Sequence, residues 1–223
     1  MPTLTQRLST LRELYAGKIK PEIAEKLERH LAELRSRNYT ECIPKVGTPA
    51  PSFSLKNQQG VEVSSARLLQ DGPLVVSFFR GTWCPYCNLE LAALASAYDA
   101  FRAAGAKVVL ITPQSAESAR GYLAQHDVPF PVLVDPDAQV AEAFGLAYTF
   151  PEYLKELYVN VFSNDLESLN AGGTWRLPIP GRFVIGADGL IADAQADPDY
   201  RFRPDPEDTL AVLDRLRVTS TTV

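Results

Sequence analysis

A pair of cysteines directly after a buried strand is the feature that most constrains the fold of this chain. Residues 74–79 (LVVSFF) form an almost entirely apolar run, which predicts a central strand covered on both faces. Cys84 and Cys87 follow as C-P-Y-C, and apolar residues then recur at helical spacing. This order places both sulfurs in the first turn of a helix, where free backbone N–H groups and the helix dipole stabilise a thiolate. The sequence therefore predicts a redox-active cysteine pair in an α/β fold.

Other uses of cysteine fit the chain less well. With Cys42, the 223 residues contain three cysteines, too few for a secreted disulfide scaffold. The two histidines show no metal-ligand spacing to the pair, so we expect no metal. Asn88 stands where covalent haem attachment needs histidine. We expect Cys42 to be a bystander, with a resolving role as the alternative.

Composition and charge restrict the partners. Apolar residues make up 46% and charged residues 22%, as in ordinary globular proteins, and the net charge is -5. Without a basic excess, we do not expect nucleic-acid binding. The longest apolar run is too short to span a bilayer, and polar residues interrupt the N-terminal leucines. We therefore expect a cytoplasmic protein without membrane association.

The N-terminal region predicts a helical hairpin. Residues 3–38 show two amphipathic patterns, whose apolar positions are Leu4, Leu8, Leu11 and Tyr15, then Ile23, Leu27, Leu31 and Leu34. This apolar stripe packs either on the rest of the chain or on a second subunit, which would give a homodimer. We expect residues 1–43 to be a helical extension, 44–217 a single domain and 218–223 a flexible tail.

From residue 45 onward, strand and helix patterns alternate. This alternation predicts a central mixed sheet flanked by helices. Beyond the cysteines we expect strands at 107–112, 131–134, 181–185 and 190–194, and helices at 115–125, 137–144, 151–162 and 205–217.

Several segments resemble the peroxiredoxin-like branch of the alkyl hydroperoxide reductase and thiol-specific antioxidant (AhpC/TSA) family. They are VGTPAPSFSL at 46–55, FRGTWCPYC at 79–87, DPD at 135–137, IPGRFVI at 179–185 and DPDY at 197–200. The resemblance covers roughly residues 44–215 and implies a thioredoxin-like fold of the peroxiredoxin type.

The family pattern leaves the roles of the two cysteines open. Peroxiredoxins usually carry P-x-x-x-T-x-x-C, which places the attacking cysteine on Cys87, with Cys84 at the threonine and Arg80 at the proline. Thioredoxin precedent makes Cys84 the nucleophile instead. We expect Cys87 to attack and Cys84 to resolve. The i, i+3 spacing also predicts an intramolecular Cys84–Cys87 disulfide that leaves Cys42 free.

The resemblance also implies roles for a proline and an arginine. Pro180 matches the thioredoxin proline that follows a cis peptide bond and lies against the cysteines. The peroxiredoxin active-site arginine would fall at this same position. Its role therefore remains open among Arg80, Arg176 and Arg182, and we place Arg80 and Arg182 in the predicted site.

The function implied is that of a thiol peroxidase that needs no metal or organic cofactor. It would reduce hydrogen peroxide or organic hydroperoxides and be regenerated by a thioredoxin-like or glutaredoxin-like dithiol. A thioredoxin-like reductase of protein disulfides is the alternative. A non-enzymatic redox sensor, in which the disulfide changes docking of the N-terminal hairpin, is the third hypothesis.

Overall fold

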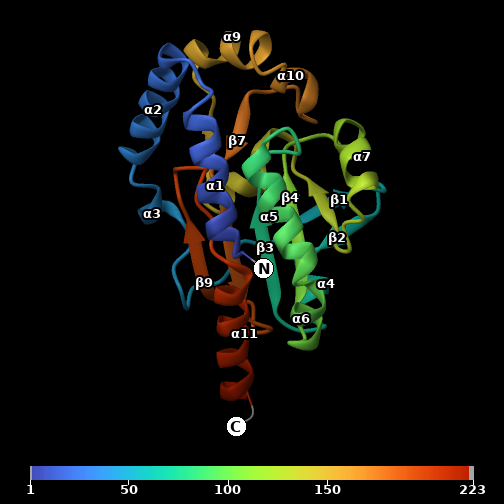
Figure 1. The fold of residues 1–223 in the computed structure, drawn as a ribbon. Coiled ribbons are helices and arrows are strands. Elements are labelled where there is room, and N and C mark those ends of the chain that lie inside the picture. Colours follow the sequence, from blue (N-terminus) through green and yellow to red (C-terminus); the bar gives the residue numbers. More distant parts are fainter. Residues whose placement is uncertain (1, 221–223) are drawn as a thin grey trace.

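The computed structural model describes residues 2–220, and a mixed seven-stranded sheet lies at its centre (Figure 1). Its strands are β1 (Ser54–Asn57), β2 (Glu62–Ser64), β3 (Leu74–Phe78), β4 (Lys107–Thr112), β5 (Val132–Val134), β8 (Gly181–Ile185) and β9 (Ile191–Ala196). The strand order is β2-β1-β5-β4-β3-β8-β9. The central β3, β4 and β5 run parallel, and the remaining neighbours pair antiparallel. The predicted fold class is confirmed.

Helices cover both faces of this sheet. They are α1 (Leu4–Ala16), α2 (Pro21–Arg35), α3 (Tyr39–Cys42), α4 (Ser65–Leu69), α5 (Pro85–Ser96), α6 (Tyr98–Ala103), α7 (Ala116–Gln125), the 3-10 helix η1 (Pro136–Ala138), α8 (Gln139–Ala143), α9 (Glu152–Asn160), α10 (Leu166–Leu169) and α11 (Pro206–Ser220). A separate two-stranded sheet pairs β6 (Ala147–Thr149) with β7 (Arg176–Pro178). No helix within residues 2–220 has the length and apolar character needed to cross a bilayer.

The elements differ from the sequence prediction at several places. The helix expected at 137–144 is broken, because Asp137 and Ala138 both have positive φ. The two-stranded sheet and α10 were not predicted. The last helix continues to Ser220, into the segment expected to be a flexible tail, and residues 221–223 of that segment lie outside the described residues.

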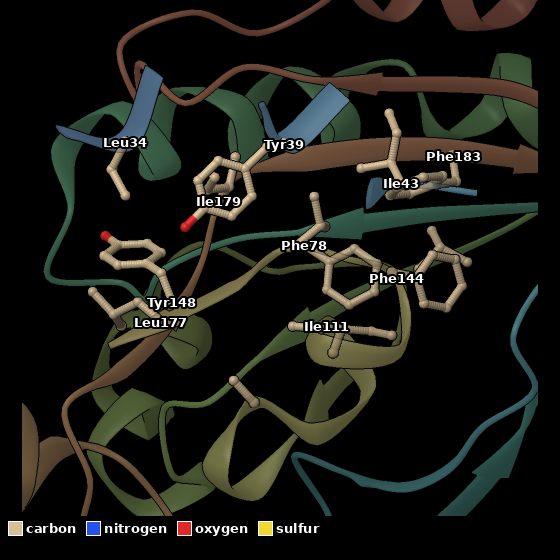
Figure 2. Close-up of a cluster of buried hydrophobic side chains, with 14 of the residues drawn as sticks. Leu34, Tyr39, Ile43, Phe78, Ile111, Phe144, Tyr148, Leu177, Ile179 and Phe183 are labelled. Carbon is tan, nitrogen blue, oxygen red and sulfur yellow. The ribbon is translucent and has the colours of Figure 1, made fainter. Parts of the chain in front are cut away.

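The buried strand β3 contributes side chains to two hydrophobic clusters, one on each face of the sheet. Val75 packs in the cluster that contains Cys84 and Cys87. Phe78 belongs to the opposite cluster, where its ring lies 5.0 Å from that of Phe144 and 5.9 Å from that of Phe183 (Figure 2). All five residues of β3 are buried, so the strand forms a rigid support for the loop that follows it.

The helical hairpin formed by α1 and α2 packs against its own chain. In Figure 1, α1 lies along α5, the helix that carries the cysteines. Leu4 and Leu8 belong to the same cluster as those cysteines. Leu27 and Leu34 belong to the opposite cluster, together with side chains of α9. Because most of the apolar stripe is buried within the chain, the structure gives no support to a homodimer formed through these helices.

Candidate active site

The two cysteines lie at the start of α5, as predicted. Cys84 is the N-cap residue of this helix and has extended backbone angles. Pro85 takes the first helical position, where its missing N–H costs no hydrogen bond. Cys87 follows in the first turn. Both thiols are free and buried, with exposed fractions of 2% for Cys84 and 0% for Cys87.

The loop between β3 and α5 is held by side chains around it. Gly81 has a φ of 149°, and a Cβ at this position would overlap the indole of Trp83. The backbone N–H of Thr82 donates to Oε1 of Gln114 at 2.7 Å. Asn88 donates from its amide to the Thr82 carbonyl at 2.9 Å. These contacts fix the approach of the chain to Cys84.

The surroundings of Cys84 favour its thiolate. Burial alone would raise its pKa, but the hydrogen bond from the Cys87 thiol and the charges of Arg80 and Arg203 outweigh burial and lower the pKa of Cys84 to about 5. The Arg80 Nη1 atom lies 3.9 Å from the Cys84 Sγ atom. A thiol with this pKa is ionised at neutral pH and is a nucleophile.

The surroundings of Cys87 have the opposite effect. Burial raises the pKa of Cys87 well above its usual value, and the adjacent Cys84 thiolate raises it further. Arg203 Nη2 lies 3.5 Å from Cys87 Sγ and partly offsets this rise. The difference between the two thiols favours Cys84 as the nucleophile, which is the reverse of the assignment expected from the peroxiredoxin pattern.

Arg80 is held beside Cys84 by aromatic side chains. Only 1% of Arg80 is exposed, and its Nη2 donates to the Tyr158 hydroxyl at 3.0 Å. Its guanidinium lies 4.9 Å from the Trp83 ring centroid and 4.3 Å from that of Tyr200. Of the three candidate arginines, Arg80 is the one that the structure brings to the reactive sulfur.

Arg182 instead belongs to a buried ionic cluster next to the cysteines. Glu90 accepts from Arg182 Nη2 at 2.9 Å through one oxygen and from Arg203 Nε at 2.6 Å through the other. Ser77 donates to the same carboxylate at 2.9 Å. Burial works against ionisation of Glu90, yet the two arginines outweigh it and lower its pKa. The third arginine, Arg176, is partly exposed and pairs with a glutamate outside this cluster.

Arg203 was missed at the sequence level. It contacts Cys87 across 116 positions of sequence, and no spacing in the chain indicates that contact. It also lies beyond the strands, in the loop before α11, where composition predicts only a helix start. A long-range contact of this kind becomes visible only when the fold is known.

The cis-proline prediction was wrong. Among residues 2–220 no peptide bond is cis, so the Ile179–Pro180 bond is trans. The Ile179 N–H donates to Leu146, and the Pro180 carbonyl accepts from Asp197 at 3.4 Å. The chain therefore continues directly from β7 into β8 and makes no turn at this proline. Pro180 lines a separate hollow with Phe202 and lies outside the cavity that contains Cys84.

Cys84 lies in a cavity of about 570 Å³, here called the cysteine cavity. Helices α1 and α2 form one wall, and the start of α5, the α9 region and Tyr200 form the rest. Within the described part of the chain, no group of three or more His, Cys, Asp or Glu side chains is arranged to hold a metal ion. Cys42 is exposed at the end of α3 and does not line this cavity.

The sequence model of the AhpC/TSA family matches residues 46–194, which is more than half of the chain. The chain belongs to the AhpC/TSA family. The match excludes α1, α2 and the segment that carries Tyr200 and Arg203.

Two curated relatives illustrate the range of similar proteins. The chloroplastic peroxiredoxin Q of Sedum lineare is 33% identical over 115 residues, which cover 52% of this chain and 61% of that protein. The thiol-disulfide oxidoreductase ResA of Bacillus subtilis is 30% identical over 102 residues, which cover 45% of this chain and 56% of that protein. The chain thus spans roughly half the length of the curated relatives it matches.

Solved structures share the fold at low identity. Peroxidoxin BcpB of Mycobacterium tuberculosis superposes with a TM-score of 0.61 at 21% identity, covering 77% of this chain and 97% of that one. The yeast mitochondrial 1-Cys peroxiredoxin gives 0.60 at 18% identity, covering 80% and 79%. These likenesses establish a peroxiredoxin-like fold.

Proposed function

We propose that this chain is a thiol peroxidase in which Cys84 attacks the peroxide and Cys87 resolves the product. The observation that carries the proposal is the position of Cys84, which lines the cysteine cavity and lies 3.9 Å from Arg80 Nη1, whereas Cys87 does not line that cavity. The charge of Arg80 lowers the pKa of Cys84 in this position. Membership of the AhpC/TSA family and the similarity to peroxiredoxin Q support peroxide as the substrate.

The first step forms a sulfenic acid on Cys84. Its thiolate attacks the terminal oxygen of ROOH, so that an S–O bond forms and the O–O bond breaks. The electron pair leaves on RO⁻, which takes up a proton and departs as ROH. Arg80, 3.9 Å from the attacking sulfur, is placed to stabilise the negative charge that develops on these oxygens.

The second step forms the disulfide. The Cys87 sulfur attacks the Cys84 sulfenic acid, an S–S bond forms, and the hydroxyl leaves as water with the thiol proton. An external dithiol then supplies two electrons by thiol–disulfide exchange. Arg203, 3.5 Å from the Cys87 sulfur, favours the negative charge on Cys87 when it attacks the sulfenic acid and when it leaves as a thiolate during reduction by the dithiol. Cys42 takes no part and remains free.

Reduction of protein disulfides is the second candidate function. It is favoured by the similarity to ResA and by the low pKa of the first cysteine of the pair. The burial of Cys84 opposes it, because only 2% of this residue is exposed and the α1–α2 hairpin forms a wall of its cavity. A protein disulfide could reach this sulfur only if the hairpin moved.

Stopped-flow tryptophan fluorescence of the reduced protein separates the hypotheses, because Trp83 adjoins Cys84 and reports its oxidation. Rapid quenching by one equivalent of hydrogen peroxide, with slow reaction toward an oxidised protein substrate, is expected for the peroxidase. The opposite order of rates would indicate a protein disulfide reductase. Slow reaction with both, together with a change in hydrogen exchange in α1 and α2 on oxidation, would indicate a redox sensor.

A further inference from the structure

The first step of the proposed peroxidase reaction needs a proton for the departing oxygen. When hydrogen peroxide is the substrate, the leaving group is hydroxide, the conjugate base of water, whose pKa is about 15.7. A proton donor placed at this oxygen accelerates such a step by about 100- to 10,000-fold. Arg80 stabilises the developing charge but keeps its protons, because arginine is not deprotonated in proteins. Another group is therefore needed to supply the proton.

Tyr158, on helix α9, lies next to Arg80 in the cysteine cavity. Its side chain lines the cavity, and only 4% of the residue is exposed. Its hydroxyl accepts a hydrogen bond from Arg80 Nη2 at 3.0 Å. The other terminal nitrogen of the same guanidinium, Nη1, lies 3.9 Å from the Cys84 sulfur. One planar group thus contacts both the reactive sulfur and this hydroxyl, so a peroxide bound against the arginine lies within reach of both.

The hydroxyl of Tyr158 has its own proton available for donation. A phenolic hydroxyl can accept one hydrogen bond and donate another, and here the bond that it accepts comes from Arg80. Within residues 2–220, no oxygen or nitrogen of the chain accepts a hydrogen bond from this hydroxyl. The proton is therefore free for a substrate oxygen, and the adjacent guanidinium stabilises the negative charge that the transfer leaves on the phenol oxygen.

Aromatic side chains hold the ring of Tyr158 in place. Its centroid lies 4.5 Å from that of Phe150 and 5.3 Å from that of Phe162. The third neighbour is Trp83, the residue directly before Cys84, whose ring centroid lies 5.8 Å away. All three contacts are edge-to-face arrangements, which are favourable for aromatic pairs. The hydroxyl is thereby positioned before a substrate arrives, as a catalytic group requires.

The other tyrosines of the cavity are less suited to this role. Tyr15, Tyr86 and Tyr200 also line it, but no hydrogen bond joins their hydroxyls to Arg80 in the described part of the chain. Burial raises the pKa of Tyr86 to about 12 and that of Tyr200 well above its usual value, so both hold their protons tightly. Of the four phenols that line the cavity, Tyr158 is the one hydrogen-bonded to the arginine at the reactive sulfur.

We propose that Tyr158 is the general acid of the peroxidase reaction and donates its hydroxyl proton to the departing oxygen. As the Cys84 thiolate attacks the near oxygen, an S–O bond forms and the O–O bond breaks. The electron pair of that bond goes to the far oxygen, which takes the phenol proton and leaves as water or ROH. Water then reprotonates the phenolate. This assignment rests on the proposed peroxidase function and adds to it the catalytic residue that supplies the proton.

The test compares two peroxides whose leaving groups differ in basicity, by stopped-flow tryptophan fluorescence of the reduced protein. Hydrogen peroxide releases hydroxide, which needs a proton, whereas peracetic acid releases acetate, which is a stable anion at neutral pH. Tyr158→Phe should slow the reaction with hydrogen peroxide about 100-fold and leave that with peracetic acid largely unchanged. Tyr153→Phe removes a hydroxyl from the same helix outside the cavity and should leave both rates unchanged.

Alkylation of Cys84 by iodoacetamide separates proton donation from positioning of Arg80, because alkylation needs the thiolate but no proton donor. Tyr158→Phe should keep the pH profile of alkylation of the parent, since the rings of Trp83 and Tyr200 still hold the guanidinium. Equal slowing with both peroxides, together with a shifted alkylation profile, would show that Tyr158 only positions Arg80 and would overturn the assignment.

The parent protein gives a further test that does not depend on the folding of a variant. In D₂O its reaction with hydrogen peroxide should slow more than its reaction with peracetic acid, because a proton moves only in the first. Equal isotope effects on the two reactions would overturn the assignment. Rapid reaction of the parent with hydrogen peroxide that is unchanged in Tyr158→Phe would also overturn it and leave the peroxidase function intact. A parent that reacts with neither peroxide would refute the peroxidase function itself.

Discussion

Replacing Arg80 by methionine tests the electrostatic basis of the site. The guanidinium lies 3.9 Å from the Cys84 sulfur, and two unit charges at about 4 Å attract by about 4 kcal/mol at an effective dielectric constant of about 20. That energy corresponds to about 3 pKa units. Arg203 and the hydrogen bond from Cys87 remain in the variant, and the shorter side chain admits water. We therefore expect Arg80→Met to raise the pKa of Cys84 from about 5 by about 2 units.

The assay is the pH dependence of alkylation of Cys84 by iodoacetamide, followed by mass spectrometry of the modified peptide. The midpoint of this profile gives the pKa of the thiol and does not require peroxidase activity. At pH 6 the thiolate fraction should fall about tenfold in Arg80→Met. Arg80→Lys keeps the positive charge and should retain most of the effect.

Arg176→Met is the matched control. Arg176 is partly exposed and pairs with Glu142 away from the cysteines, so its removal should leave the alkylation profile unchanged. A midpoint in Arg80→Met within half a unit of the parent value would refute the role of Arg80. Equal shifts in Arg80→Met and Arg176→Met would show that the effect comes from net charge alone.

Three further predictions concern stability, measured as the free energy of unfolding in denaturant. Glu90→Gln should lower the free energy of unfolding by about 3–5 kcal/mol, because it leaves two buried arginines without their carboxylate. The same change at exposed Glu142 should lower it by less than about 1 kcal/mol. Equal losses in the two variants would show that the buried cluster does not depend on the charge of Glu90. Burial, aided by the charge of Arg80, lowers the pKa of His30 to about 4. As the pH falls from 7 to 4, the free energy of unfolding of the parent should therefore fall by about 3 kcal/mol relative to that of His30→Leu. A difference between the two proteins that stays constant with pH would show that His30 has the same pKa in the folded and unfolded states. Gly81→Ala should cost about 1–3 kcal/mol because of its positive φ and the adjacent indole, and a cost near zero would show that the loop can relax.

Local sequence patterns correctly predicted the buried strand and the helix that position the two cysteines. The apolar run at 74–79 and the following C-P-Y-C were enough to place Cys84 and Cys87 at the start of a helix, because a buried strand, a turn and an N-terminal proline each follow from neighbouring residues. The amphipathic N-terminal pattern likewise predicted two helices with a buried face. It could not show that this face packs on α5 and α9, since periodicity indicates only that a face is buried.

Long-range contacts account for what the sequence could not predict. The Glu90–Arg203 pair joins residues 113 positions apart, and neither has a local signature. The resemblance of residues 179–185 to a thioredoxin segment predicted a cis bond before Pro180, and the bond is trans. The pKa of Cys84 also depends on the positions of Arg80 and Arg203 in space, and counting positions along the motif does not indicate these contacts.

The most direct test of the central claim uses two single mutants, Cys84→Ser and Cys87→Ser, each reduced and mixed with one equivalent of hydrogen peroxide. The account predicts that Cys84→Ser loses the rapid fluorescence phase. Cys87→Ser should keep this phase and accumulate a sulfenic acid on Cys84 that dimedone traps for mass spectrometry. A rapid phase that survives in Cys84→Ser, with dimedone trapped on Cys87, would contradict the assignment of Cys84 as the attacking cysteine.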